Sequence, residues 1–139
     1  MNNILFIITG SIAASRCKEI ITLLRKKEVK ISCILTKEAK KYIKISDIKK
    51  LLKNRIFTDE DEKKNKMLHI NLSRDNDIIV MCPATANSIA KFANGYGDNL
   101  ASNTLLASNK KILFVPAMNS FMWHNKINQK NVRLLKDSG

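Results

Sequence analysis

Three short turns, rich in small and polar residues, carry the groups best suited to bind a ligand. They are Thr9-Gly10-Ser11, the string PATANS at residues 83–88, and Pro116-Ala117-Met118-Asn119. Glycine lets a ligand approach the backbone, hydroxyl and amide groups donate hydrogen bonds, and free N–H groups at a helix N-terminus favour an anion. Such turns suit a phosphate or a carboxylate.

Each turn taken alone also has a plain structural interpretation. The first is neither GxGxxG nor a P-loop, and a tight turn with a serine cap explains it about as well. The second reads as a proline, a loop and an N-cap, which account for Pro83 and one hydroxyl but not for the whole string. The third reads as a capped helix with a buried Met122 and Trp123.

The turns follow apolar runs that predict strands. These runs are residues 3–9, 29–35, 77–82 and 111–115, and the first two have the β-branched character of strands buried on both faces. We expect Pro83 and Pro116 to end the last two. Segments with helical spacing lie between and after them, at residues 12–27, 37–43, 47–52, 86–93, a stretch through 107, and 127–136.

Strands that alternate with helices predict an α/β fold, in which helices cover both faces of a parallel sheet. Ligands bind such sheets beyond the carboxyl ends of the strands. Three polar turns at successive strand ends therefore predict one shared cofactor pocket.

Finer expectations concern single helices and loops. Ile12, Ile20, Leu23 and Leu24 predict the apolar stripe of the first helix. Ser46 is expected to cap the helix at residues 47–52, and Gly139 suits the end of the last helix. The charged segment 58–66 (TDEDEKKNK) is interpreted as a solvated loop without function.

Composition limits the class of protein. A chain of 139 residues, 45% of them hydrophobic, predicts one domain with a real core. No apolar run is long enough to cross a bilayer, and residues 4–8 lack the basic start of a signal peptide, so we expect a cytoplasmic protein without membrane contact. Cys17, Cys33 and Cys82 lie in apolar or helical patterns, which predicts buried thiols and no metal site.

The formal charge of +13 comes from lysines scattered along nearly every predicted element. That distribution does not favour nucleic-acid binding, although a basic nucleic-acid binder stays an alternative that would show salt-dependent retention of DNA. A cationic surface favours anionic small ligands, including phosphates.

Longer strings around the turns resemble a known family. PATANS followed by IAKFANGYGDNLAS, and then PAMNSFMW, is similar to the PASANTIAK, GxxDxLL and PxMNxxMW strings of the flavin-containing cysteine decarboxylases. The opening TGSIAASRCKE is similar to the family's GGIAAYK-type start, and residues 67–70 match its active-site HI segment. The resemblance covers nearly the whole chain, in the family's order and spacing.

The resemblance implies a flavodoxin-like (Rossmann-like) three-layer fold, FMN as cofactor, and a homotrimer or a multiple of trimers with each flavin near a subunit interface. Ser11 would contact the phosphate or the ribityl chain, and PATANS would contact the flavin and its phosphate. The FMN contacts that the resemblance implies are Gly10, Ser11, Ile12, Thr36, Pro83, Ala84, Thr85, Ala86, Asn87, Ser88, Ala117 and Met118.

The resemblance also implies a reaction, the decarboxylation of 4'-phosphopantothenoylcysteine to 4'-phosphopantetheine in coenzyme A biosynthesis. His69 would assist proton movement while the substrate cysteine is oxidised to a thioaldehyde, and Asn119 would hold the carboxylate. Loss of carbon dioxide then gives an enethiol, and the reduced flavin returns the two electrons to this enethiol. Asp98 receives no step, and His124 is expected at the surface.

The family completes this reaction with a cysteine on a glycine-rich segment downstream of PxMNxxMW. The sequence ends at Gly139, so residues 1–139 are interpreted as an FMN-binding decarboxylase domain without that segment, and Cys17, Cys33 and Cys82 do not replace it. Alternatives are an oxidative peptide-cysteine decarboxylase that stops at the enethiol, and a non-catalytic flavin-binding relative, either regulatory or decayed. A flavin prenyltransferase shares the architecture but not the joint PATANS and PAMN pattern.

Overall fold

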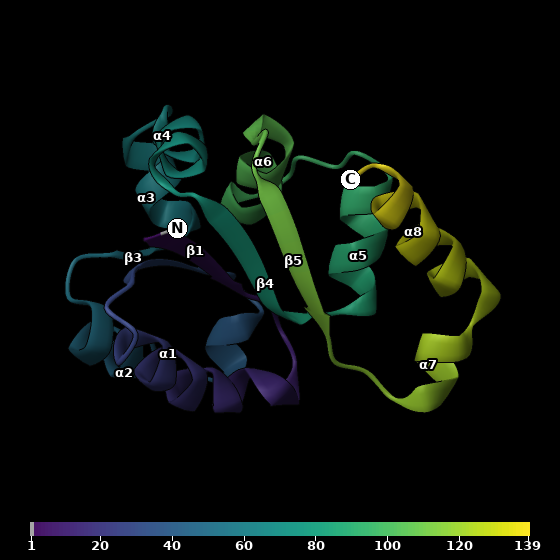
Figure 1. Ribbon diagram of the computed structural model, residues 1–139, viewed down its shortest axis with the longest axis horizontal. Helices are drawn as coiled ribbons and strands as arrows, with labels where there is room; N and C mark the ends of the chain where they lie inside the picture. Colours follow the sequence, from purple (N-terminus) through teal and green to yellow (C-terminus); the bar gives the residue numbers. More distant parts are fainter. Residues whose placement is uncertain (1) are drawn as a thin grey trace.

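The computed structural model describes residues 2–139 and forms one sheet of five parallel strands (Figure 1). Their order across the sheet is β3-β2-β1-β4-β5, which confirms the predicted α/β fold. The strands are β1 (Asn3–Ile8), β2 (Lys30–Leu35), β3 (Ile56–Phe57), β4 (Ile78–Ala84) and β5 (Lys111–Pro116). The two-residue strand β3 was not predicted, because so short a run carries no periodic signal.

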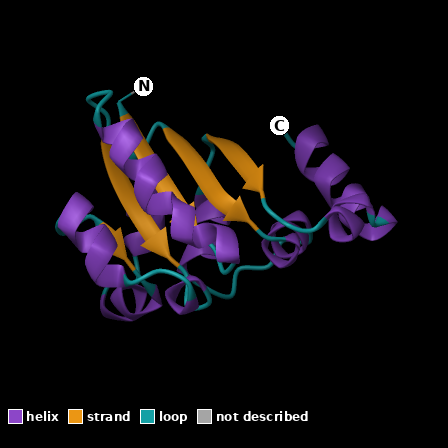
Figure 2. Ribbon diagram, turned by 90° about the horizontal axis from the view of Figure 1, so that it is seen from below, coloured by secondary structure: helices purple, strands orange, loops and turns teal. Residues whose placement is uncertain are grey.

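Helices cover both faces of the sheet. The α-helices are α1 (Cys17–Arg25), α2 (Ile45–Leu52), α3 (Asp59–Lys64), α4 (Leu68–Asp75), α5 (Ala86–Ala93), α6 (Leu100–Ala107), α7 (Ser120–His124) and α8 (Lys126–Asp137), and the 3₁₀ turns are η1 (Ile12–Arg16) and η2 (Ala39–Lys41). Helices α1 and α2 lie on one face, and α4, α5, α6 and α8 lie on the other (Figures 1 and 2). This is the predicted three-layer arrangement.

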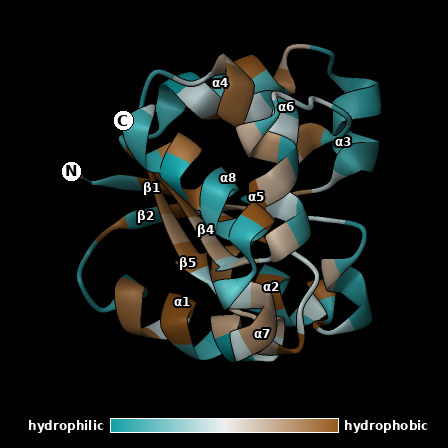
Figure 3. Cartoon of the chain, turned by 90° about the vertical axis from the view of Figure 1, so that its right-hand side faces the viewer, coloured by the Kyte–Doolittle hydropathy of each residue, from teal (hydrophilic) through white to brown (hydrophobic). Residues whose placement is uncertain are grey.

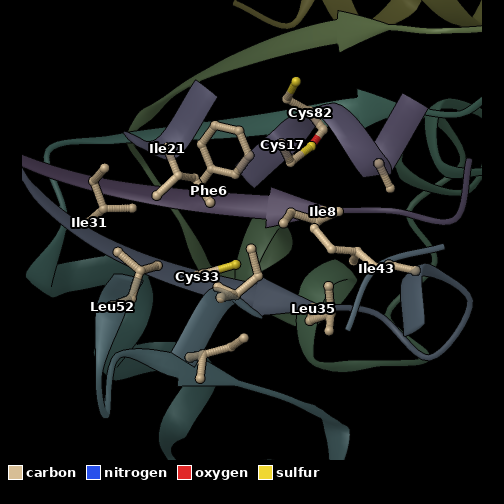
Figure 4. Close-up of a cluster of buried hydrophobic side chains, with 14 residues drawn as sticks. Phe6, Ile8, Cys17, Ile21, Ile31, Cys33, Leu35, Ile43, Leu52 and Cys82 are labelled. Atoms are coloured by element: carbon tan, nitrogen blue, oxygen red, sulfur yellow. The ribbon is translucent and has the colours of Figure 1, made fainter. Parts of the chain in front are cut away.

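The core on the α1–α2 face packs Phe6 and Ile8 of β1 against Ile21 of α1 (Figure 4). Ile48 of α2 belongs to the same cluster. Within it lie the three cysteines, all buried and all free, as predicted. The Cys17 thiol donates a hydrogen bond to the carbonyl oxygen of Cys82, at 3.1 Å. Burial raises the pKa of the Cys33 thiol well above its ordinary value, because the thiolate would lose its hydration.

The core on the other face joins Leu5 and Ile7 of β1 to α4, α5 and α6. Alternate residues of β1 thus serve opposite cores, as expected for a central strand of a parallel sheet. Figure 3 shows apolar residues along the central strands and mainly hydrophilic residues along α8. Among the described residues, no helix is long and apolar enough to cross a membrane.

Several helix predictions need correction. The segment 12–27 begins as the 3₁₀ turn η1 and becomes α-helical only at Cys17, which changes the phase of its buried face. Ile12 and Leu23 are therefore 79% and 60% exposed, while Cys17 and Ile21 are buried. In the segment 37–43, only the 3₁₀ turn η2 is helical.

The start of α2 and the end of β4 also differ from the prediction. Helix α2 starts at Ile45, with Lys44 in the capping position, so Ser46 does not cap it. Pro83 does not end β4, because the strand continues to Ala84 through a cis Cys82–Pro83 peptide and a shift in register. A proline at such an irregularity removes no regular ladder hydrogen bond. By contrast, β5 ends at Pro116 as predicted, with the proline as its last residue.

The segment interpreted as a solvated loop is helix α3. Thr58 and Asp61 form a capping box, in which the Thr58 N–H donates to Asp61 Oδ2 at 2.8 Å. Four acidic residues occupy the first turn, where the helix dipole favours negative charge. These local stabilising interactions explain why a strongly charged stretch is helical. At the other end of the chain, Gly139 has a φ of +98° after the last turn of α8, as predicted.

Candidate functional site

The first turn is held by short contacts at Thr9, Gly10 and Ser11. Thr9 is buried at the end of β1, and its hydroxyl donates a hydrogen bond to the carbonyl oxygen of Pro83, at 2.5 Å. A Cβ added to Gly10 would lie 2.4 Å from Cβ of Glu38, so only glycine permits this close approach. Ser11 caps η1 by accepting a hydrogen bond from the Ala13 N–H at 3.2 Å.

Thr36 continues this edge at the end of β2. It is buried, and its N–H donates to the carbonyl oxygen of Ile8, at 3.2 Å. Its hydroxyl oxygen accepts a hydrogen bond from the N–H of Ala39, at 3.3 Å. The loops after β1 and β2 are therefore held side by side at the carboxyl ends of their strands.

The PATANS turn leads from β4 into α5. Thr85 is the N-cap, and its hydroxyl oxygen accepts a hydrogen bond from the Ser88 N–H at 3.1 Å. The same hydroxyl donates to Ser88 Oγ at 2.9 Å. Pro83 and Ala84 are buried, whereas Asn87 is exposed. The capping interpretation thus holds for Thr85, and Asn87 is the side chain of the string that reaches the surface.

The third turn packs against the second. The N–H of Ala117 donates to the carbonyl oxygen of Ala84, at 3.2 Å. Asn119 is exposed and caps α7, with its Oδ1 accepting a hydrogen bond from the Met122 N–H at 2.8 Å. Met122 is exposed and Trp123 is half-buried, so the expected buried Met–Trp pair is not formed. Both are on a short helix that covers little of the sheet.

A small cavity at this edge brings hydroxyls from three loops together. Thr9, Thr36 and Ser88 line it, and its volume of about 30 Å³ suits a group of the size of one water. Asp98 also lines it and pairs with Lys91 at 2.7 Å, a hydrogen bond that holds the pKa of this carboxyl below its ordinary value. A larger ligand would extend from this cavity over the exposed rim.

His69 lies apart from these loops, on the first turn of α4. Its Nδ1 is 3.1 Å from Oε1 of Glu62, and both side chains are largely buried. Asn119 is at the start of α7, and α4 and α7 lie at opposite ends of the molecule in Figures 1 and 3. One copy of the chain therefore does not bring the two predicted catalytic residues together.

A second cavity, larger at about 700 Å³, lies elsewhere. Residues of the edge strand β5 and of α5 and α8 line it, and apolar side chains dominate its walls; among them are Ile89, Phe92, Ile112, Phe114, Trp123 and Val132. None of the predicted FMN contacts or catalytic residues lines it. Hydrogen-bonding groups converge at the strand ends instead, so we assign the candidate site there.

Sequence reasoning missed contacts that position this site. It did not assign the hydroxyl of Thr9, although Thr9 precedes the glycine of the first turn. It also dismissed the segment that contains Glu62. The spacing Thr58-x-x-Asp61 is a capping-box signal that could have indicated the helix. No local signal could have shown that Asn103 of α6 contacts Glu62, at 3.2 Å, because 41 residues separate the two.

The residues at the strand ends fit a phosphate-bearing flavin. Hydroxyls and backbone N–H groups converge there, and the Asp98 carboxylate, which would repel a phosphate, is neutralised by Lys91. The described residues hold no group of three or more His, Cys, Asp or Glu side chains placed to bind a metal ion.

Comparisons with known proteins agree with this geometry. The sequence matches the family described as Flavoprotein over residues 1–139. It is 32% identical to a probable phosphopantothenoylcysteine decarboxylase of Streptococcus mutans, over 98% of this chain and 78% of that protein. It is 34% identical to epidermin decarboxylase of Staphylococcus epidermidis, over 94% and 70% of the two chains.

Solved structures extend the likeness to the fold. The FMN-dependent cysteine decarboxylase SpaF superimposes with a TM-score of 0.93 and 30% identity, over 100% of this chain and 81% of that chain. Bifunctional coenzyme A biosynthesis proteins are also similar, and the chain spans about a third of their length (34%).

The fold is thus that of the flavodoxin-like proteins, with the candidate site at the carboxyl ends of the strands. The chain belongs to the flavoprotein family, among the flavin-containing cysteine decarboxylases.

Proposed function

We propose that the chain binds FMN and decarboxylates 4'-phosphopantothenoylcysteine to 4'-phosphopantetheine, in the cytoplasm. The proposal rests on one observation: the loops that follow three strands meet at a small cavity lined by Thr9, Thr36 and Ser88. Family membership supports a flavin and a decarboxylation, and the streptococcal relative supports the particular substrate. Residues 1–139 would be the FMN-binding decarboxylase domain.

The loops described above would hold the cofactor. Gly10, Ser11 and Ile12 would lie along it, and the turns around Thr36 and Ala117 would border it. The side chains of Asn87 and Ser88 and the first N–H groups of α5 would donate to its polar edges, while Pro83 and Ala84 would contribute backbone and Met118 an apolar surface. When bound, FMN supplies the two-electron redox chemistry that lets carbon dioxide leave.

Asn119 is suited to hold the substrate carboxylate. Capping α7 uses its oxygen, so its amide N–H₂ group can donate two hydrogen bonds. His69 would accept a proton from the cysteine moiety through an imidazole nitrogen.

The separation of α4 from α7 supports an assembly in which His69 of one copy and Asn119 of another border the same flavin. We propose the homotrimer, or a multiple of it, on this basis. Mixing His69→Gln and Asn119→Ala subunits, each inactive alone, tests this. Recovered turnover in mixed assemblies supports a shared site, and no recovery, with mixed oligomers verified by mass spectrometry, contradicts it.

Oxidative decarboxylation of a peptide cysteine is the second candidate, and the likeness to epidermin decarboxylase and SpaF favours it. The two reactions differ in their electron balance. If electrons return to the substrate, the product has lost only carbon dioxide. If they do not, the product has also lost two hydrogens, and the flavin stays reduced until an oxidant such as oxygen takes the electrons.

The purified chain should therefore be titrated with FMN and incubated with phosphopantothenoylcysteine or with a peptide ending in cysteine. Absorption changes that saturate at one FMN per chain, and a product of the first substrate that has lost carbon dioxide alone, would support the proposal. Turnover of the peptide alone would establish the second candidate. A folded chain without affinity for FMN would contradict both.

A further inference from the structure

Helix α3 is held in place by contacts with α6. The carboxylate of Asp59 accepts a hydrogen bond from the N–H of Leu100, at 3.0 Å. One turn later, Oε1 of Glu62 accepts a hydrogen bond from Nδ2 of Asn103, at 3.2 Å. Together with the Thr58–Asp61 capping box, these contacts fix both the start of α3 and the orientation of Glu62.

The fixed carboxylate of Glu62 faces His69. Oε1 of Glu62 lies 3.1 Å from Nδ1 of His69, and the two side chains are 20% and 26% exposed. Nδ1 itself is buried, and the carboxylate lies off the direction of a straight N–H bond, so the contact is chiefly electrostatic. Within residues 2–139, Nδ1 has no other polar partner.

A carboxylate beside one ring nitrogen selects the tautomer of a neutral histidine. An ionised carboxylate only accepts hydrogen bonds, so it favours the form that carries the proton on the nearer nitrogen. That form leaves the opposite nitrogen, Nε2, with a free lone pair.

We propose that Glu62 is a positioning residue for His69, one that keeps the proton on Nδ1 and leaves Nε2 to exchange protons with the substrate. The catalytic part of this proposal rests on the function proposed above, whereas the tautomer does not. The segment that sequence reasoning dismissed as a solvated loop would then contribute to the chemistry of the site.

Nitrogen NMR of the imidazole rings tests the tautomer without substrate or flavin. The chain has two histidines, and the exposed His124 provides an internal reference. Spectra are recorded over a series of rising pH values, and the tautomer is read from those in which the ring nitrogen shifts no longer change with pH. We expect His69 to carry its proton on Nδ1 in the natural chain, and Glu62→Gln to move it towards Nε2.

Glu60→Gln is the matched control, because Glu60 is on the same helix but exposed and paired with Lys63 at 3.3 Å. It should leave the His69 spectrum unchanged. If Glu62→Gln does not fold, Asn103→Ala loosens the same carboxylate without removing it and should shift the tautomer in the same direction. A His69 spectrum that is the same in the natural chain, Glu62→Gln and Asn103→Ala would overturn the proposal.

Kinetics of the FMN-loaded protein then test the positioning role. We expect Glu62→Gln to lower kcat by on the order of tenfold or more with little change in KM, because proton transfer slows while substrate binding persists. Equal kcat values for Glu62→Gln and Glu60→Gln would refute that role. His69→Gln separates the two ideas, since full turnover in that variant would refute the proposed role of His69 whatever Glu62 does.

Discussion

Strands β1 and β5 share the tripeptide Ile-Leu-Phe but differ in how far it is buried. In β1 it is Ile4-Leu5-Phe6, and in β5 it is Ile112-Leu113-Phe114. Leu5 is fully buried, whereas Leu113 is 52% exposed. The central strand is covered on both faces, while β5 is the edge of the sheet in the described part of the chain.

The register with β4 explains the difference. Phe6 and Leu113 both pair with Val80, so the two tripeptides are offset by one residue and their equivalent side chains face opposite layers. Leu113 faces the side of α1 and α2, which do not extend over β5 (Figure 1). An apolar tripeptide thus suffices to form a strand, but position and register decide whether it is buried.

The largest expected effect contrasts the two leucines. Leu5→Ala should lower the free energy of unfolding by about 2–5 kcal/mol, because it leaves a cavity in a closed core. Leu113→Ala should lower it by only about 0.5 kcal/mol, as is usual for surface sites. Urea denaturation followed by circular dichroism measures both, and similar losses would show that β5 is covered in solution.

Next in size is a pH effect at Cys33, the β2 partner of Phe6. The buried thiol has a raised pKa, so its stabilising effect is complete below the unfolded pKa of about 9.0 and is lost as the pH rises further. The free energy of unfolding should fall by up to about 1.4 kcal/mol per pH unit more steeply in the natural chain than in Cys33→Ala. Unfolding in reductant between pH 8 and 10, roughly one unit either side of the ordinary thiol pKa, measures this. Parallel curves would mean that water reaches the thiol in the native state.

A smaller effect concerns the aromatic pair that links β5 to α5. The rings of Phe92 and Phe114 are 5.9 Å apart and inclined by 29°. A double-mutant cycle with alanine should give a coupling energy of about 0.5–1.5 kcal/mol. A coupling energy of zero would mean that the contact between the two rings does not stabilise the packing of β5 against α5.

The smallest expected effect is that of Leu113→Lys. Because the side chain of Leu113 is already exposed, the free energy of unfolding should change by no more than about 0.5 kcal/mol. A charge on an edge strand also opposes pairing with another chain, so sedimentation should show less non-specific association. A loss comparable to that of Leu5→Ala would contradict the view of β5 as an open edge.

The sequence predicted the layered fold because the strands are apolar and separated by helical segments. It failed where burial depends on distant partners, as at Leu23, or where short-range polar contacts outweigh composition, as at Thr58 and Asp61 in α3. The hydroxyl-lined edge was predictable from the turns themselves. The separation of His69 from Asn119 could not be predicted in this way, because no local pattern shows that α4 and α7 lie at opposite ends of the molecule.

The hydrogen bonds between the loops of the site depend on main-chain carbonyl oxygens of β4 and not on rim side chains. The carbonyl oxygens of Pro83 and Ala84 accept hydrogen bonds from Thr9 and Ala117, and neither contact involves a rim side chain. Exposed rim residues such as Ile12 and Asn87 can therefore be exchanged without changing the spacing of the loops. A library randomised at the rim would therefore test whether ligand preference can change while the framework beneath stays constant.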